Sequence, residues 1–153
     1  MAYTRPDKIK ATAHIETIVH TADLKNGQFV NLGVIDETLG GEAVSVKLTP
    51  TTTKPDAILM TEHLNYGYPD YDIAKQVTKA GKMGRAYIIE AGNTISFSED
   101  LVAVGVAVGD DVAVGANGLG LIKADGVDDV VIGKVIGEDY LANIGELKIV
   151  RFK

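Results

Sequence analysis

Apolar and polar residues alternate along much of this chain, in short runs separated by turn-forming residues. Alternation with a period of two is the pattern of a β-strand that packs one face against a core. Residues 43–48 show it most clearly, because Val44, Val46 and Leu48 would share one face. Residues 57–60 are continuously apolar, which predicts a short buried strand. Further strands are predicted at 29–32, 85–90, 94–97, 130–136 and 146–152.

A ladder of valines occupies residues 102–108. Val102, Val104, Val106 and Val108 would all face one way if this segment were a strand. The residues between them are alanine or glycine, which are too small to fill space alone. We therefore expect a strand with one thin face that is exposed or covered by a neighbour.

Pairs of turn-forming residues separate the predicted strands. Asn26-Gly27 and Asn117-Gly118 are strong turn signals, and Gly40-Gly41 marks another turn. The chain has 17 Gly but only 4 Pro and no Trp, a composition that favours short elements joined by tight turns. These features favour β structure.

One segment, residues 71–81, has the pattern of a helix. Ile73, Ala74 and Val77 form an apolar stripe at helical spacing, and Gly81 would end the helix. The sequence thus predicts a mainly β (α+β) protein with a β-barrel or β-sandwich body and one short α-helix.

The N-terminal residues 1–21 differ from the body, because they are rich in Thr and Ala and hold few large apolar side chains. Residues 15–19 have strand character, but the segment has little with which to form a core. Fully extended, it would span about 65 Å. We expect a mobile or partner-ordered arm over residues 1–21, followed by a single β-rich domain over residues 22–153.

Charge is distributed unevenly between these two parts. The whole chain carries a net charge of −6, which argues against binding to a nucleic-acid backbone. Residues 1–10 hold three cations, Arg5, Lys8 and Lys10, against Asp7, a sum of +2 that leaves −8 on the remainder. This contrast predicts an arm that meets an acidic protein surface, with ordinary scatter of charge as the alternative.

Composition limits the classes of chemistry further. The chain is 46% hydrophobic and 24% charged, as folded proteins are. It contains no Cys, which excludes disulfides, thiolate zinc sites and cysteine nucleophiles. No apolar run approaches the roughly 20 residues of a membrane helix, and the first residues lack the apolar stretch of a signal peptide. We expect a protein made in a cytoplasm that does not act at a membrane.

Glycine-rich segments offer no nucleotide site. Residues 115–120 have the spacing G-x-x-G-x-G, and no predicted helix follows, so a hairpin turn is favoured over a dinucleotide loop. The pairs Gly81-Lys82 and Gly133-Lys134 lack the earlier glycine and the following Ser or Thr of a phosphate-binding loop.

Catalytic and metal-binding constellations are also missing from the sequence pattern. His14, His20 and His63 have no metal-ligand spacing, and surface positions are expected for them. No serine lies in a nucleophile elbow. Paired carboxylates could bind Ca²⁺ or hydrolyse glycosides, but these pairs lie in glycine-rich turns and are interpreted as solvated. They occur at residues 99–100, 110–111 and 128–129.

Three tyrosines, Tyr66, Tyr68 and Tyr71, lie close together in a predicted loop. Tyrosine provides a large contact area at low entropic cost and is enriched at interfaces. These side chains would form either an interface or a packing layer on the protein's own helix.

The order of turn-and-strand phrases resembles that of the capsid decoration, or cement, proteins of tailed bacteriophages. The likeness spans roughly residues 22–152 and is diffuse, being made of short phrases and not of invariant chemistry. The phrases that carry it are residues 22–30, 41–44, 79–87, 92–98, 112–115 and 132–136.

The resemblance implies a non-enzymatic virion protein, without cofactor or metal, that binds the outside of the assembled head and bridges major capsid protein subunits, often as a homo-trimer. The arm would lie across the capsid subunits, and deleting residues 1–20 would abolish binding but leave a folded body. The implied contact residues are Tyr3, Arg5, Lys8, Lys10 and Ile15 in the arm, together with Tyr66, Tyr68 and Tyr71.

Three alternatives remain open at this point. The first is another virion component, such as a tail-tube or head-completion protein. The second is a trimeric β-barrel enzyme of nucleotide metabolism, which would need an ordered Asp and Ser set that the sequence does not display. The third is a carbohydrate-binding module, for which the tyrosine loop is the sole hint.

Overall fold

The computed structural model describes residues 2–61 and 75–153. Nearly half of them belong to strands, and three 3₁₀ turns, η1 (Glu37–Leu39), η3 (Glu99–Leu101) and η4 (Ala116–Gly118), connect strands. The strands are β1 (Thr4–Lys8), β2 (Ile15–Val19), β3 (Leu24–Lys25), β4 (Phe29–Asp36), β5 (Ala43–Leu48), β6 (Ala57–Leu59), β7 (Val77–Thr78), β8 (Gly84–Ile88), β9 (Thr94–Ser98), β10 (Asp111–Val114), β11 (Leu121–Lys123), β12 (Gly133–Leu141) and β13 (Gly145–Phe152).

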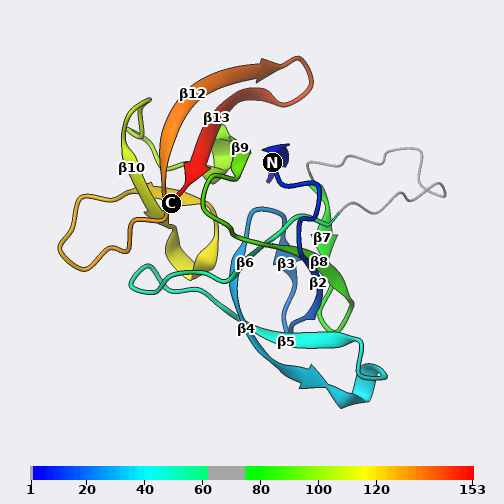
Figure 1. Ribbon diagram of the computed structural model, residues 1–153. Coiled ribbons are helices and arrows are strands. Elements are labelled where there is room, and N and C mark those ends of the chain that lie inside the picture. The colour runs from blue at the N-terminus through cyan, green and yellow to red at the C-terminus, as the bar shows by residue number, and fades with distance from the viewer. Residues whose placement is uncertain (1, 62–74) are drawn as a thin grey trace.

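The strands form a closed barrel and a separate open sheet. The barrel has the order β2-β5-β4-β6-β8, and the six-stranded sheet has the order β1-β9-β13-β12-β10-β11. Figure 1 shows the barrel in the lower half of the molecule and β12 and β13 arching over the upper half. Strands β3 and β7 form a separate two-stranded sheet, and Leu24 of β3 packs into the barrel core. The prediction of a mainly β protein with a barrel is confirmed.

Strand β6 and the first two residues of β4 are buried on both faces, which explains why their sequence is apolar at each position. Phe29 in β4 and Ile58 in β6 point to the core that the barrel shares with the six-stranded sheet. Their neighbours Val30 and Leu59 point to the barrel interior. Since successive side chains of a strand face opposite ways, a strand between two cores must be apolar at every position.

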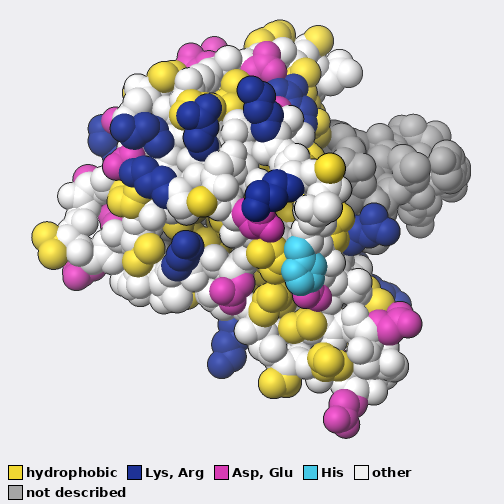
Figure 2. All heavy atoms as spheres, viewed as in Figure 1, with side chains coloured by type: hydrophobic (Ala, Val, Ile, Leu, Met, Phe, Trp, Pro, Cys, Tyr) yellow, Lys and Arg dark blue, Asp and Glu magenta, His cyan; other side chains and the backbone are white. Residues whose placement is uncertain are grey.

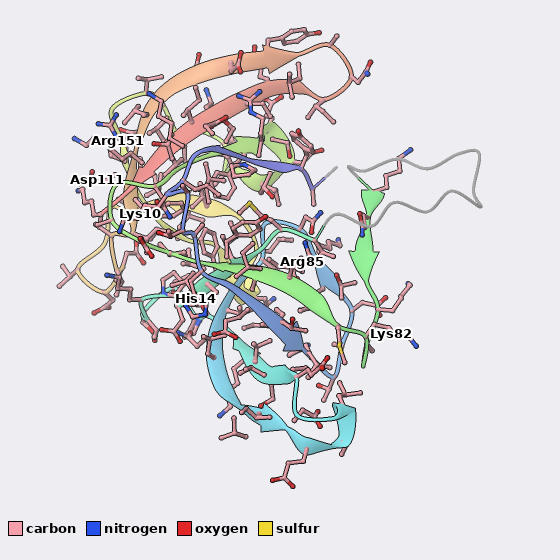
Figure 3. The ribbon with its side chains drawn as sticks, turned by 45° about the vertical axis from the view of Figure 1, so that its right-hand side comes forward. Lys10, His14, Lys82, Arg85, Asp111 and Arg151 are labelled. Carbon is pink, nitrogen blue, oxygen red and sulfur yellow. The ribbon has the colours of Figure 1, made fainter. Side chains whose placement is uncertain are left out.

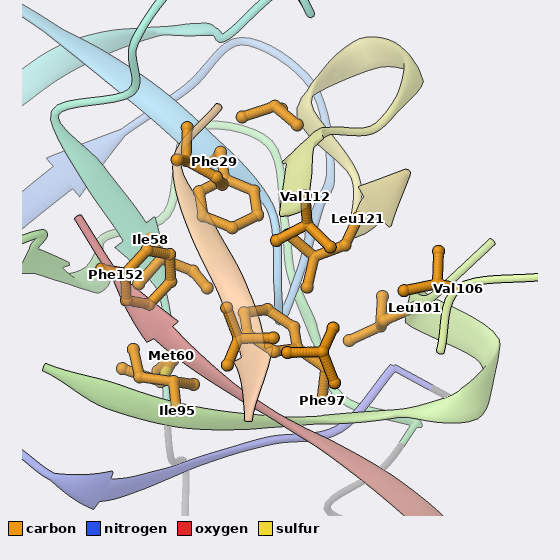
Figure 4. Close-up of a cluster of buried hydrophobic side chains, with 14 residues drawn as sticks. Phe29, Ile58, Met60, Ile95, Phe97, Leu101, Val106, Val112, Leu121 and Phe152 are labelled. Atoms are coloured by element: carbon orange, nitrogen blue, oxygen red, sulfur yellow. The ribbon is translucent and has the colours of Figure 1, made fainter. Parts of the chain in front are cut away.

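The shared core is the larger of the two and is organised around three phenylalanines. Phe29 of the barrel stacks on Phe97 of β9, with ring centroids 6.0 Å apart. Phe152 of β13 meets both rings edge-on, at 6.3 Å from Phe29 and 6.5 Å from Phe97. Figure 4 shows this cluster between the two layers, with Leu121 among the surrounding aliphatic side chains. The three rings therefore join the barrel to the sheet.

Most strand predictions agree with the structure. Residues 43–48 match β5 in full, and the predictions at 57–60, 85–90, 94–97 and 146–152 fall on β6, β8, β9 and β13. The strand expected at 130–136 instead begins at Gly133 and continues to Leu141. Asn117-Gly118 lies in the turn between the antiparallel strands β10 and β11, as predicted.

The prediction of a valine strand over residues 102–108 is wrong. Two successive turns replace it, closed by hydrogen bonds from the Val106 amide to the Ala103 carbonyl (3.3 Å) and from the Asp110 amide to the Ala107 carbonyl (3.1 Å). Gly105 and Gly109 occupy the third position of each turn with φ of +93° and +94°, a conformation that glycine adopts without strain.

As a result, the valines do not share a face. Val104 and Val108 stand at the corners of the turns and are fully and half exposed, whereas Val106 is buried in the shared core. The prediction treated Gly105 and Gly109 as small residues between outward-facing valines. Each of these glycines instead lies in one of the two turns.

The predicted helix over residues 71–81 is also wrong in its described part, because Val77–Thr78 form strand β7 and pair with Leu24–Lys25. The amides that would continue a helix bond elsewhere. The Ala80 amide donates to Asp23 Oδ1 (2.9 Å), and the Gly81 amide donates to the His20 carbonyl (2.9 Å). Residues 62–74, including the start of this segment, lie outside the described residues.

The N-terminal segment is not a free arm in this structure. Strand β1 pairs antiparallel with β9, with Thr4 opposite Phe97. Strand β2 lies between β5 and β8 and closes the barrel, and its Ile18 and Val19 are buried. The segment lacked enough apolar residues to form a core of its own, but it completes two cores that the rest of the chain supplies.

Candidate functional site

A row of side chains crosses the six-stranded sheet on the face turned away from the core. Lys8 of β1 is paired with Thr94 of β9, which is paired in turn with Arg151 of β13. Arg151 is paired with Lys134 of β12, and Lys134 with Asp111 of β10. Paired residues of antiparallel strands point to the same face. We call these five residues the cationic row.

Burial confirms which way the row points. Of its charged members, Lys8, Lys134 and Arg151 are exposed and Asp111 is half-buried, while Thr94, between Lys8 and Arg151, is buried. The next paired set along the same strands, Ile95 and Val150, is buried in the shared core. Figure 2 shows Lys and Arg side chains gathered on the upper part of the visible face, over the region of β12 and β13. The protein is acidic overall, whereas the row itself holds three cations and one carboxylate.

The row contains more cationic side chains than carboxylates. Asp111 is the one carboxylate in the row, and it contacts Lys153 at 3.0 Å and Lys134 at 3.9 Å. Within the described part of the chain, Lys8 and Arg151 form no ion pair. Arg151 and Lys134 face each other directly, an arrangement of like charges that destabilises a sheet slightly. The row is therefore suited to receive anionic groups.

A shallow hollow of about 320 Å³ lies beside the Lys8 end of the row. It is lined by Lys8, Ile9, Lys10 and the turn of residues 91–93. The turn is held to the end of β13 by reciprocal bonds between residues 92–93 and Phe152, at 3.0 and 2.9 Å. Figure 3 shows Lys10, Asp111 and Arg151 on the same side of the molecule. Lys10 also contacts Glu90 at 2.5 Å.

A network around Arg5 fastens β1 to the sheet. Arg5 Nε lies 2.6 Å from Asp7 Oδ1, and Arg5 Nη2 lies 2.7 Å from Asp139 Oδ2 in β12. The Ser96 hydroxyl of β9 donates to the Asp7 carboxylate. The hydrogen bond to Asp139 is the main cause that raises the pKa of Arg5 above its usual value. Reciprocally, Arg5 and the Tyr140 amide lower the pKa of Asp139.

We expect this network to make stability fall in acid. The pKa of Asp139 is lower in the folded state than in the unfolded chain, so its contribution is present above about pH 4 and is lost as the pH falls through the folded value. Asp139→Asn should flatten the acid side of a plot of unfolding free energy against pH, measured in urea. Asp128→Asn, at an exposed loop carboxylate, is the control. An unchanged slope in Asp139→Asn would contradict the assignment.

Some of the residues predicted to form an interface are exposed in the structure, and others are engaged in contacts within the chain. Lys8 and Lys10 are exposed at one end of the cationic row, but Arg5 is engaged within the chain. Tyr3 is half-buried, and its amide and carbonyl both bond to Ser98, at 3.1 and 2.9 Å. Ile15 lies on the barrel and is 42% exposed. Tyr66, Tyr68 and Tyr71 lie outside the described residues.

No motif in the sequence singled out Lys134, Arg151 or Lys153 as a functional residue. Arg151 and Lys153 alternate with the buried Val150 and Phe152, so their common outward direction could have been predicted from the strand pattern. Their position beside Lys8 could not, because it depends on β9 pairing with β1 and β13 at once.

Two other candidate side chains, Asp110 and His14, form contacts within the chain. Asp110 accepts from the Ala107 amide (2.9 Å) and contacts Lys123 (3.0 Å), which holds a turn. His14 is exposed and contacts Glu16 at 2.7 Å. The described residues contain no group of three or more His, Asp or Glu side chains placed to hold a metal ion. None of the helices among them is long and apolar enough to cross a membrane.

Comparison with protein-family models and with curated proteins finds no match. Among solved structures, the chain is similar to the N base of the head fiber protein gp8.5 of bacteriophage phi29. The TM-score is 0.58 at 13% sequence identity, and the match covers 93% of this chain and 95% of that chain. At this identity the likeness is one of fold, and it extends over nearly the whole of both chains.

Proposed function

We propose that this protein is a structural component of a bacteriophage head that attaches to the outer surface of the assembled capsid. The observation that carries the proposal is the match to the phi29 head fiber base over almost the full length of both chains. A shared arrangement of barrel and sheet over that length favours a shared role as an attachment module. The turn-and-strand phrases of the sequence point to the same class of protein.

The architecture suits a part that adheres and bears load. Strands that are distant in the sequence pair with one another: β1 pairs with β9, and β2 closes the barrel between β5 and β8. The large phenylalanine core then joins barrel to sheet. We propose the major capsid protein as the partner, with binding that bridges its subunits, a homo-trimer as the assembled form, and a non-enzymatic role without nucleic-acid contact.

The N-terminal segment takes a different part in this proposal from the one expected of an arm. Because β1 and β2 complete the sheet and the barrel, they supply the body's stability, and the surface for attachment is the outer face of the sheet that β1 helps to form.

The test is detection of the protein on particles of the phage whose genome carries its gene. Particles purified by density gradient should retain the chain, and added protein should co-sediment with expanded heads emptied of DNA. Antibody labelling viewed by electron microscopy should decorate the head exterior. Recovery of the chain in the tail fraction alone, or in no particle fraction, would overturn the proposal.

A base for a fiber is the second candidate, because the matched phi29 structure is itself described as the N base of a head fiber. The same micrographs separate the two roles. A decoration protein adds a low knob at each site, whereas a fiber base carries a projection away from the shell.

A further inference from the structure

We propose, resting on the proposed attachment to a phage head, that the cationic row is the surface by which this protein docks on an acidic patch of its partner protein. The row comprises Lys8, Thr94, Arg151, Lys134 and Asp111. It carries more positive charge than the chain neutralises, although the protein as a whole is acidic.

The unbalanced charge is the first argument. Asp111 is the one carboxylate of the row, and it contacts Lys134 and the adjacent Lys153, whereas Lys8 and Arg151 form no ion pair with the described residues. Lys134 and Arg151 stand directly opposite each other, which costs stability in the isolated molecule. An acidic partner would remove this repulsion on binding, so part of the stabilisation would exist only in the complex.

The dimensions of the row are the second argument. It crosses five adjacent strands, β1, β9, β13, β12 and β10. With neighbouring strands about 4.8 Å apart, the row extends over roughly 19 Å. A single small anion would contact only a part of it, whereas a protein surface could contact all of its charged side chains. The strands also fix the backbone of each residue, so little ordering is needed on binding.

Mixed charge is the argument for a protein partner over a nucleic acid. Asp111 lies within the row, and Glu90 lies next to Lys10 at its end. These carboxylates, together with the net charge of −6, would repel a continuous line of phosphates. A folded partner can place its own carboxylates against the cations alone, and the hollow beside Lys8 and Lys10 is placed to receive one of them.

The experiment compares two double variants of equal charge. Lys8→Glu/Arg151→Glu reverses the charge of two residues of the row. Lys47→Glu/Lys82→Glu reverses two exposed lysines of the barrel region that form no ion pair with any described residue. Figure 3 shows Lys82 far from Arg151. Binding to purified heads is measured by co-sedimentation. We expect the row variant to bind about tenfold or more weakly, and the control within about twofold of the wild type.

Two measurements accompany the comparison. Urea unfolding checks that each variant is folded, and Lys8→Gln/Arg151→Gln replaces the row variant if the reversed charges prevent folding. Wild-type binding should weaken as NaCl rises from about 0.05 to about 0.3 M, because the screening length falls from roughly 14 to roughly 6 Å. Equal head binding by the row variant and the control would overturn the proposal.

The remaining outcomes distinguish this inference from the proposed function. If wild-type protein does not bind heads, the proposed function fails, and the row is then judged by retention on poly-L-glutamate, where equal retention of the row and control variants would overturn it. Tighter binding to duplex DNA than to poly-L-glutamate would overturn the choice of a protein partner. A wild-type oligomer that only the row variant dissociates would show that the row joins copies of this chain, and would likewise overturn it.

Discussion

Deletion of residues 1–20 is expected to unfold the protein, not to leave a stable body without its arm. The deletion removes β2, which closes the barrel between β5 and β8, and β1, which covers the edge of β9. It exposes two unpaired barrel edges and takes Ile18 and Val19 out of the core. Each buried aliphatic side chain contributes roughly 1.5–3 kcal/mol.

The total loss should be on the order of 5 kcal/mol or more once the strand hydrogen bonds are included, which is comparable with the whole stability of many domains. We expect the truncated chain to show no cooperative transition in urea. The control replaces Ala11 and Thr12, in the exposed turn between β1 and β2, by serine and should change stability by about 0.5 kcal/mol or less. A native-like transition in the truncated chain would show that both layers form without their N-terminal strands.

Phe97→Ala should cost about 3–5 kcal/mol of unfolding free energy. Phe97 is fully buried, and it contacts the ring of Phe29 from the barrel and the ring of Phe152 from β13. Removing the ring leaves a cavity at the junction of the two layers, and the strands that surround it are fixed by their own hydrogen bonds, so the cavity cannot close fully.

The measurement is urea unfolding monitored by circular dichroism. An unchanged slope of the unfolding free energy against urea concentration is taken as evidence for a two-state transition. Tyr140→Ala is the matched control, because Tyr140 is an aromatic residue of the same sheet that is 66% exposed. Its loss should be about 0.5 kcal/mol or less. A cost below about 1 kcal/mol for Phe97→Ala would mean that the three rings do not hold the layers together.

Strands could be predicted where the local sequence pattern was compatible with only one kind of element. Residues 43–48 alternate cleanly and form β5, and the continuous apolar run at 57–60 marks β6, which has a core on each side. The same kind of evidence failed at residues 102–108, because alternation counts glycine as a spacer and ignores its preference for the third position of a turn.

The predicted helix failed for a different reason. An apolar stripe at helical spacing does not show whether another segment can pair with the same residues as a strand. Val77–Thr78 pair with β3 in this way. The amides that follow are bonded to Asp23 and His20 and so cannot extend a helix. Tertiary hydrogen bonds overrode a weak local preference.

By itself, the sequence determined the strand-rich class, the main turns and the lack of cysteine chemistry, because backbone preference and side-chain type act over a few residues. Only the tertiary structure decided the role of the N-terminal segment and the composition of the cationic row. Thr4 meets Phe97, and Lys8 comes to share a face with Arg151, through pairings between strands that are far apart in the chain. Which distant strand a segment joins depends on the burial that the whole fold achieves, and no local pattern contains that information.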